Sequence, residues 1–213
     1  MKGLFLDNFY KTISSMKLLA FFVLIAAIAL LVTGDCTIME LFVYISITAL
    51  SATAVSSMRK DAEAKWNKYE LTLPIKRKGI IKCKYLSYLF WVLIGTVIAV
   101  IFTGLAVFIH GNVFFAYGIR DVISLFALGI GIAMMVGALF YPMAYLFGAD
   151  KSETLLVVSI IGSVGLAVLG IWFVNNVINL NYYPGLCVFV IAYISIFALS
   201  YIFTNIIYCN KEF

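Results

Sequence analysis

Positive charge gathers in one stretch of this sequence, next to aromatic residues. Nine of the fifteen lysines and arginines lie between Arg59 and Lys84, in the same stretch as Trp66, Tyr69 and Pro74. Cationic groups beside aromatic rings can lie on anionic lipid or form an anchored contact with another protein. They are not the nucleophiles, bases or metal ligands that covalent chemistry needs. The stretch therefore predicts a contact surface and not a catalytic centre.

Groups that could perform covalent or metal chemistry are few and scattered. There is one histidine, His110, and the cysteines Cys36, Cys83, Cys187 and Cys209 form no CxxC pair, so no zinc or redox centre is predicted. A disulfide between Cys36 and Cys187 is conceivable if both face outside. No glycine is followed by lysine, which excludes a phosphate-binding loop of the GxxxxGK[ST] type. We expect no catalytic residue, cofactor or metal in this chain.

The composition indicates a polytopic membrane protein. Of 213 residues, 64% are hydrophobic and 12% are charged, and the mean hydropathy is +1.09. The net charge is +5. The basic residues flank apolar runs and do not form a stripe on a polar domain, which argues against nucleic-acid binding. Apolar runs predict one all-α domain, 1–213, with six membrane-spanning helices: Leu18–Val32, Leu41–Met58, Tyr85–Phe108, Val122–Phe147, Leu155–Val174 and Leu186–Ile207.

The distribution of charge predicts the orientation of these spans. With both termini inside, 14 of the 15 basic residues lie on the cytoplasmic side, and Arg120 is the exception. Aromatic residues near the inner span ends, such as Tyr85, Tyr88 and Tyr141, are compatible with a belt at the headgroup level. Packing of these rings between helices is an equally good interpretation.

The cytoplasmic loop 59–84 contains a short amphipathic pattern. The spacing predicts a helix that ends before Pro74, with apolar side chains three and four residues apart on one face. These side chains are Met58, Ala62, Trp66, Tyr69 and Leu73. Such a helix could serve chain orientation or lie on lipid as an anchor. Because Asp61 and Glu63 would weaken attraction to anionic lipid, docking to a protein is the favoured interpretation.

Two further segments carry recognisable patterns. Residues 1–17 alternate apolar and charged side chains at helical spacing, which predicts an N-terminal helix lying at the inner interface. In the fourth apolar run, Gly129, Ala133 and Gly137 recur every four residues. A stripe of small residues lets a neighbouring helix approach closely, so we interpret it as a packing face before a substrate face.

The apolar runs contain no Asp, Glu, Lys or Arg, whereas ion-driven transporters and proton relays usually place ionisable groups at the membrane midplane. With no energy source and no catalytic group of its own, the chain is expected to be one subunit of a larger machine.

The sequence resembles the type-2 ABC permeases of bacteria. One match is D-x-x-x-K-W-x-x-Y-x-x-T-L-P, from Asp61 to Pro74, followed by a basic cluster and KYL, Lys84 to Leu86. The other is YPMAYLFGADKSETL, Tyr141 to Leu155, which is similar to the family's P-x-x-Y-x-F-G-x-x-K element. The family often has an arginine soon after the lysine of this element. In this chain that lysine is Lys151, and Ser152 and Glu153 follow it. The branch that the chain resembles most is the permease of the phenol-soluble modulin exporter type.

The resemblance implies a dimeric permease of a bacterial ABC exporter in the plasma membrane. A second permease copy or paralogue and a separate ATP-binding subunit would be its partners, and ATP and Mg would bind that subunit. The loop 59–84 would be the coupling helix, and the docking residues would be Asp61, Glu63, Trp66, Tyr69, Leu73 and Pro74, with Asp150 and Lys151 in a smaller contact.

The expected cargo is amphipathic or hydrophobic, and it could be a peptide. Two alternatives remain open from the residues alone. The chain could be a small substrate-binding membrane subunit of a transporter with a shared energising complex, or an immunity or structural protein that transports nothing.

Overall fold

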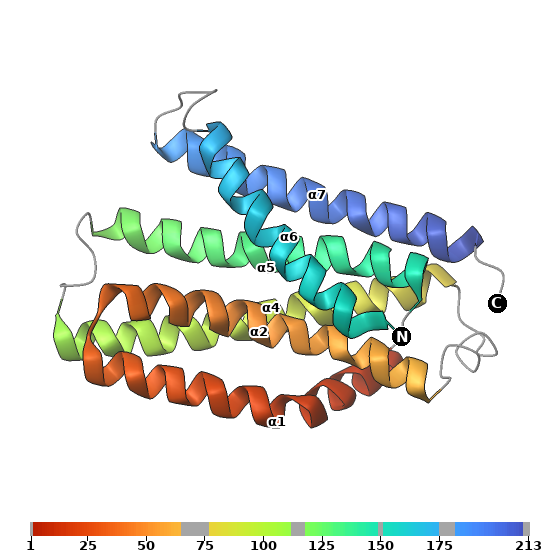
Figure 1. Cartoon of the computed structure of the whole chain (residues 1–213), viewed down its shortest axis with the longest axis horizontal. Helices are drawn as coiled ribbons and strands as arrows, with labels where there is room; N and C mark the ends of the chain where they lie inside the picture. The colour runs from red at the N-terminus through yellow and green to blue at the C-terminus, as the bar shows by residue number, and fades with distance from the viewer. Residues whose placement is uncertain (1, 65–76, 112–117, 149–150, 175–181, 211–213) are drawn as a thin grey trace.

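The computed structural model describes residues 2–64, 77–111, 118–148, 151–174 and 182–210, and the regular structure within these ranges is helical throughout. Helices suit an apolar chain because each satisfies its backbone hydrogen bonds internally. Figure 1 shows the helices in order: α1 (Lys2–Thr33), α2 (Cys36–Glu63), α4 (Arg77–His110), α5 (Ile119–Phe147), α6 (Ser152–Phe173) and α7 (Tyr182–Asn210).

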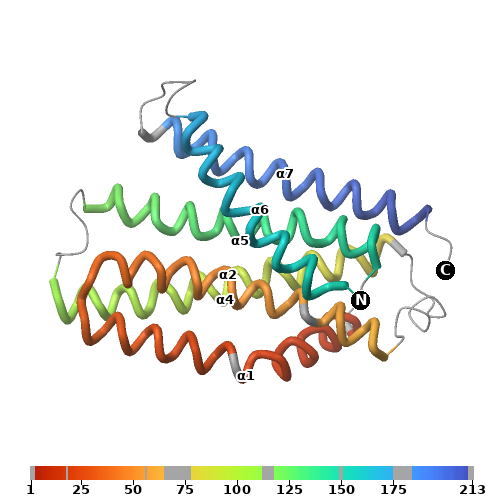
Figure 2. The backbone as a smooth tube through the Cα atoms, viewed as in Figure 1, coloured from red at the N-terminus to blue at the C-terminus, as the bar shows by residue number. Residues whose placement is uncertain are grey.

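Five of these helices, α2 and α4 to α7, are long and apolar enough to cross a membrane. The other, α1, bends by 57° between Gly3–Lys17 and Leu19–Thr33, and it makes a sixth crossing if the bent pair counts as one span (Figure 2). The chain is thus a multi-pass membrane protein, and the six apolar runs of the sequence correspond one to one with these helices. The bend lies after Lys17. This is the end of residues 1–17, which the sequence predicted as a separate N-terminal helix.

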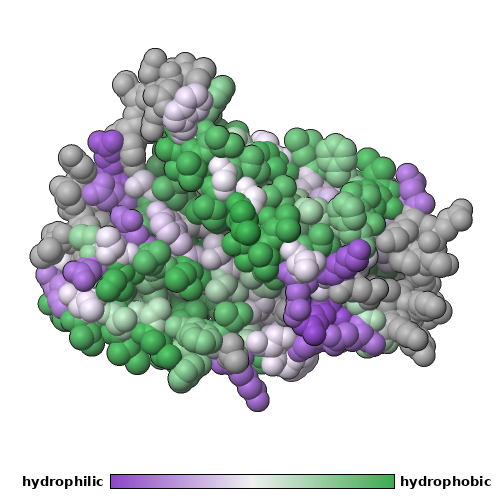
Figure 3. Space-filling view, viewed as in Figure 1, coloured by the Kyte–Doolittle hydropathy of each residue, from purple (hydrophilic) through white to green (hydrophobic). Residues whose placement is uncertain are grey.

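The helices are longer than the apolar runs that predicted them. At a rise of about 1.5 Å per residue, the 28 residues of α2 extend over roughly 42 Å, whereas a bilayer core is about 30 Å thick. The last turns of α2, from Arg59 to Glu63, therefore project beyond the hydrocarbon. On the face drawn in Figure 3, apolar side chains form a broad band, and hydrophilic side chains gather toward its two ends.

Helix α2 lies at the centre of the bundle. It packs against α1, α4, α5 and α6, while α5 also packs against α6 and α7, and α6 crosses the bundle obliquely in Figure 1. The largest fully buried side chains include Phe42 and Ile47 of α2, Tyr88 of α4, and Phe140 and Tyr141 of α5. The aromatic residues Tyr88 and Tyr141 thus pack between helices.

A tight turn joins α1 to α2 at Gly34 and Asp35. Gly34 has φ of 66°, a conformation that a side chain would disfavour. A Cβ at this position would lie 3.0 Å from the His110 ring, whose Nε2 lies 2.9 Å from the carbonyl oxygen of Leu31. The turn and the end of α4 are therefore packed together, and His110 belongs to this contact.

Three hairpins place six helix ends at one end of the bundle, which we call the basic end. These are the starts of α1, α4 and α6 and the ends of α2, α5 and α7, gathered on one side of Figure 1. Most of the sequence's lysines and arginines belong to this end, whereas Arg120 lies near the start of α5 at the opposite end. The charged side chains of the basic end form the candidate site.

Candidate functional site at the basic end

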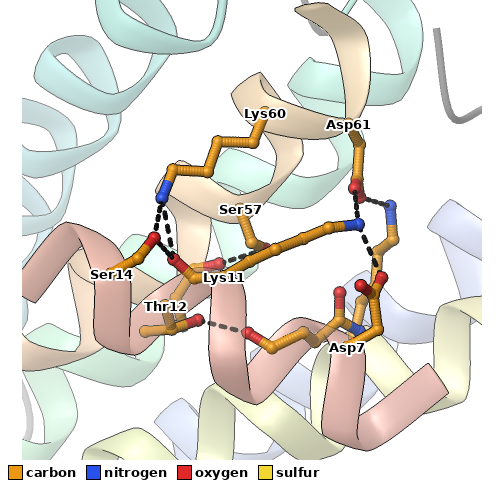
Figure 4. A network of polar contacts seen from close by, with 10 residues as sticks. Asp7, Lys11, Thr12, Ser14, Ser57, Lys60 and Asp61 are labelled. Carbon is orange, nitrogen blue, oxygen red and sulfur yellow. Dashed lines mark hydrogen bonds and ion pairs between the residues drawn. The ribbon is translucent and has the colours of Figure 1, made fainter. Parts of the chain in front are cut away.

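Asp61 lies at the centre of a buried charge network. Its side chain is 2% exposed, and its two carboxylate oxygens accept hydrogen bonds from two lysines of different helices. Lys11 Nζ of α1 lies 2.6 Å from Oδ1, and Lys84 Nζ of α4 lies 3.1 Å from Oδ2. One carboxylate of α2 thereby connects three helices (Figure 4).

The first turns of α1 make further contacts with this network. Lys11 Nζ also lies 2.5 Å from Asp7 Oδ2. Lys60, next to Asp61 on α2, donates to the backbone oxygen of Lys11 at 2.9 Å and to the Ser14 hydroxyl. Figure 4 shows Lys60 contacting the backbone end of Lys11 and Asp61 contacting its ammonium end. The N-terminal segment is held to α2 by both residues.

Pairing explains how these charges can be buried. Lys84 is 4% exposed, and an isolated charge at such a position would be strongly unfavourable. The carboxylates of Asp7 and Asp61 balance the ammonium groups of Lys11 and Lys84. Burial by itself lowers the pKa of Lys11, but the hydrogen bonds and charges of Asp61 and Asp7 outweigh it, so the pKa of Lys11 is raised above its usual 10.5.

The network continues into the aromatic interior. The Tyr141 hydroxyl of α5 donates to the backbone oxygen of Lys84 at 3.2 Å, and its ring stacks on Tyr85 at a centroid distance of 4.5 Å. Tyr85 in turn shares hydrogen bonds with Ser200 at 2.9 Å and Thr204 at 2.8 Å on α7. Four helices besides α2 are therefore linked to the position of Asp61.

The network spans both ends of the proposed coupling loop. Asp61 lies in the last turn of α2 and Lys84 lies in the first turns of α4, and the chain between these helices includes the docking residues that the sequence predicted. Trp66, Tyr69, Leu73 and Pro74 lie outside the described residues, as does Asp150.

The other predicted docking residues lie at the surface of the basic end. Glu63 is exposed, with its carboxylate 2.7 Å from the Arg59 guanidinium, and Lys151 is exposed just before α6. Asp61, predicted with them, has its carboxylate turned inward onto Lys11 and Lys84. This difference could not be predicted from the sequence, because Asp61 and Glu63 are both acidic residues in one polar run.

A cleft opens beside this surface between α1, α2 and α6. It has a volume of about 390 Å³ and is lined by Ser15, Leu19, Ala49, Ala52, Thr53, Val55, Arg59, Ser152, Glu153, Leu156 and Ile160. Arg59 of α2 and Glu153 of α6 form an ion pair at its charged rim. The buried Ser152 hydroxyl has no hydrogen-bond partner among the described residues. An apolar floor with a charged rim can accept an amphipathic molecule.

The small-residue stripe of α5 lies against two other helices. A Cβ on Gly129 would lie 2.9 Å from Ile47 Cδ1 of α2, and one on Gly137 would lie 2.5 Å from Tyr88 Cε1 of α4. Ala133 is fully buried, and its backbone oxygen accepts a hydrogen bond from the Tyr88 hydroxyl. The stripe thus contacts protein on both its glycines and lines neither the cleft nor the network.

No group of three or more metal-ligating side chains occurs among the described residues, and none of the four cysteines forms a disulfide. The described residues of the basic end hold paired charges in place.

Comparison with known proteins assigns the family. The model of a family described as "ABC-2 family transporter protein" matches residues 3–209, which is nearly the whole chain. No curated protein and no solved structure matches at a significant level. A helical multi-pass architecture agrees with this match. The chain belongs to the ABC-2 family of transporter proteins.

Proposed function

We propose that this chain, as the membrane permease subunit of an ABC transporter, exports an amphipathic or hydrophobic substrate, with peptides as the leading class. Energy comes from ATP that a separate ATP-binding subunit hydrolyses. The finer resemblance to the phenol-soluble modulin exporter type, based on the Asp61 to Pro74 motif, belongs to this proposal. The proposal also includes the cytoplasmic placement of the basic end and a second permease copy or paralogue as partner.

The observation that carries the choice of substrate is the cleft between α1, α2 and α6. Its floor is apolar, with side chains such as Leu19, Leu156 and Ile160, and charged groups stand only at its rim. A hydrophilic cargo would leave its polar groups without partners on that floor. An amphipathic helix can place its apolar face there, one charged group near Arg59 or Glu153, and a polar group on the Ser152 hydroxyl.

The basic end is the surface we assign to the ATP-binding subunit. Positive charge marks the cytoplasmic side of a membrane protein, which is the side where ATP is available. The spacing of Trp66, Tyr69 and Leu73 in the sequence predicts a shared helix face, which would supply aromatic and apolar anchors for this contact. Movement of that segment would be transmitted to α1 and α4 through the paired charges of Asp61.

Transport itself is tested with the permease reconstituted in vesicles together with the ATP-binding subunit that copurifies with it. The cargo is a fluorescent amphipathic helical peptide, and the control is a peptide of the same composition with a scrambled order, which removes the apolar face. We expect ATP-dependent movement of the amphipathic peptide alone. Equal movement of both peptides would remove the amphipathic selectivity from the proposal.

A cleft variant makes this test specific to the site. Ala52→Trp introduces a large ring among the cleft residues and is expected to reduce peptide movement at least tenfold, while the ATP-binding subunit still copurifies. Leu199→Trp is the matched control, because Leu199 of α7 is 53% exposed and is not among the cleft residues. Full transport by Ala52→Trp would show that the cargo takes another path.

Partner docking is tested separately through copurification. Truncating an aromatic anchor at a buried contact costs about 2 to 4 kcal/mol, whereas rim charges cost much less. Trp66→Ala should therefore remove the ATP-binding subunit from the purified complex, and Lys68→Ala should retain it. Retention of the partner and of transport by Trp66→Ala would leave the loop as a membrane anchor. Tight binding of a small ligand by the isolated chain would instead indicate a substrate-binding subunit.

A further inference from the structure

A second groove at the basic end lies between the start of α4 and the end of α7. Its volume is about 440 Å³, and its lining is Lys78 of α4 together with Tyr201, Ile202, Asn205, Ile206, Cys209 and Asn210 of α7. It shares no lining residue with the cleft between α1, α2 and α6. The transport proposal assigns no role to this groove.

The groove carries positive charge at its polar end. Lys78 is exposed, and Lys82, one turn further along α4, is exposed as well. Residues four apart lie on the same helix face, so two ammonium groups face the surroundings here. Among the described residues, the lining includes no acidic side chain. An anionic group is the electrostatic complement of this end of the groove.

Asn205 adds a buried hydrogen-bond acceptor. Its Nδ2 donates to the backbone oxygen of Tyr201 at 3.0 Å, while its Oδ1 is buried and has no donor among the described residues. A buried acceptor without a donor costs free energy, which a ligand with a hydroxyl or N–H group would recover. The groove therefore suits a ligand that carries both an anion and a donor.

Along α7, the groove is lined in part by apolar side chains. Ile202 and Ile206 lie four residues apart on α7, and each is 53% exposed. Since α7 is one of the helices that can cross a membrane, these side chains face lipid chains at the depth just below the headgroups. The groove thus has a polar head at the helix ends and an apolar stem along α7.

We propose that this groove binds an anionic phospholipid by its headgroup. The phosphate lies against Lys78, a headgroup hydroxyl donates to Asn205 Oδ1, and an acyl chain lies along Ile202 and Ile206. Phosphatidylglycerol has both the charge and the hydroxyl and is the probe of choice. Basic pockets between transmembrane helices at the cytoplasmic face are the usual setting for such recognition.

The experiment is a lipid titration of the full-length chain in detergent, with bound lipids counted by native mass spectrometry. Phosphatidylglycerol, phosphatidylethanolamine and phosphatidylcholine with identical acyl chains are compared. We expect selective retention of phosphatidylglycerol. Lys78→Gln should weaken its binding about fivefold, the effect of one lysine near a headgroup surface, and Lys78→Arg should restore it. Asn205→Leu, which removes the acceptor, should also weaken it.

Lys17→Gln is the matched control, because Lys17 is an exposed lysine of α1 outside the groove. It should leave phosphatidylglycerol binding unchanged. Equal weakening by Lys17→Gln and Lys78→Gln overturns the site and leaves only attraction to a basic surface. Equal binding of phosphatidylglycerol and either zwitterionic lipid also overturns the proposal. The unfolding temperature of Lys78→Gln without added lipid should match that of the native chain, which separates lost binding from lost folding.

Discussion

At the scale of single residues, Asp61 shows how one buried acid can organise a helical end. The carboxylate accepts from Lys11 and Lys84, which stand 50 and 23 residues away in the chain. A pair buried to this degree contributes little compared with an apolar pair of the same volume, but removal of one partner leaves an uncompensated charge. The network therefore matters most for the position it imposes on α1, α2 and α4.

Asp61→Asn should destabilise the chain by about 3 to 5 kcal/mol, because it removes the carboxylate that the buried Lys84 contacts. Lys84→Gln should cost less, because Asp61 keeps its contact with Lys11. The double variant should lose less free energy of unfolding than the two single variants lose together, because the Asp61 carboxylate and the Lys84 ammonium group are then both absent. Denaturant unfolding of the four proteins in mixed detergent measures this cycle.

Arg59→Gln is the matched control for this cycle. Arg59 lies in the same turns of α2 and contacts the carboxylates of Glu63 and Glu153, but its side chain is 48% exposed. Exposed pairs contribute about 0 to 1 kcal/mol, so this variant should unfold nearly as the native chain does. Strictly additive losses of Asp61→Asn and Lys84→Gln would contradict the pairing.

Lys11 gives the network a defined response to high pH. Its pKa in the folded chain is raised above 10.5, so its stabilising contribution is present below 10.5 and is lost as the pH rises through the higher folded value. The charged groups that surround it are Asp7 of its own helix, Lys60 and Asp61 of α2, and Lys84 of α4.

The stability difference between the native chain and Lys11→Met should be constant from pH 7 to about 10. Above pH 10.5 it should shrink as the native lysine loses its proton. Thermal unfolding of both proteins across this range measures the difference. A difference that already falls near neutral pH would indicate that another group governs the stability of this contact.

At the scale of helices, the contact between α4 and α5 depends on the absence of a side chain. Tyr88 is fully buried, and its hydroxyl bonds to Ser51 and to the backbone oxygen of Ala133, so its ring has no room to move. A methyl group on Gly137 would overlap that ring. Close helix packing at a small residue is a common way to join helices in membranes.

Gly137→Ala should therefore destabilise the chain by about 1 to 3 kcal/mol, the usual cost of overpacking. Gly165→Ala is the control, because nothing lies within 4 Å of a Cβ at that exposed position of α6, and it should cost nothing measurable. Unfolding in detergent compares the two. A neutral Gly137→Ala would mean that α4 can shift away from α5 without loss.

At the scale of the whole molecule, the six helix ends of the basic end define an orientation that can be measured. Cys36 and Cys187 are exposed near the starts of α2 and α7, while Cys209 is exposed at the end of α7 at the basic end. Positive charge predicts that the basic end is cytoplasmic. The cysteines therefore report on opposite sides of the membrane.

Single-cysteine variants that retain Cys36 or Cys187 should react with an impermeant thiol reagent in intact cells, whereas Cys209 should react only after lysis. Cys83 is 7% exposed and should react slowly in both conditions, so it serves as the control for burial. Rapid labelling of Cys209 in intact cells would reverse the orientation and with it the side of the ATP-binding subunit.

Part of this arrangement could be predicted from the sequence because it depends on single residues. Hydropathy predicted the helical membrane class and the six apolar runs, since transfer of a side chain into hydrocarbon is a property of that side chain. The end of α2 was predicted less well, because the helix continues past its apolar run through charged residues to Glu63.

What only the tertiary structure decided was which residues meet. The sequence marked Asp61 as a surface acid like Glu63 and did not single out Lys11 or Lys84, although the three form one buried network. It also left open whether Tyr88 and Tyr141 lie at the headgroups or between helices, where the structure places them. These outcomes depend on which helices are neighbours and how each is rotated. That choice is made by the packing of all the helices at once, which no local pattern contains.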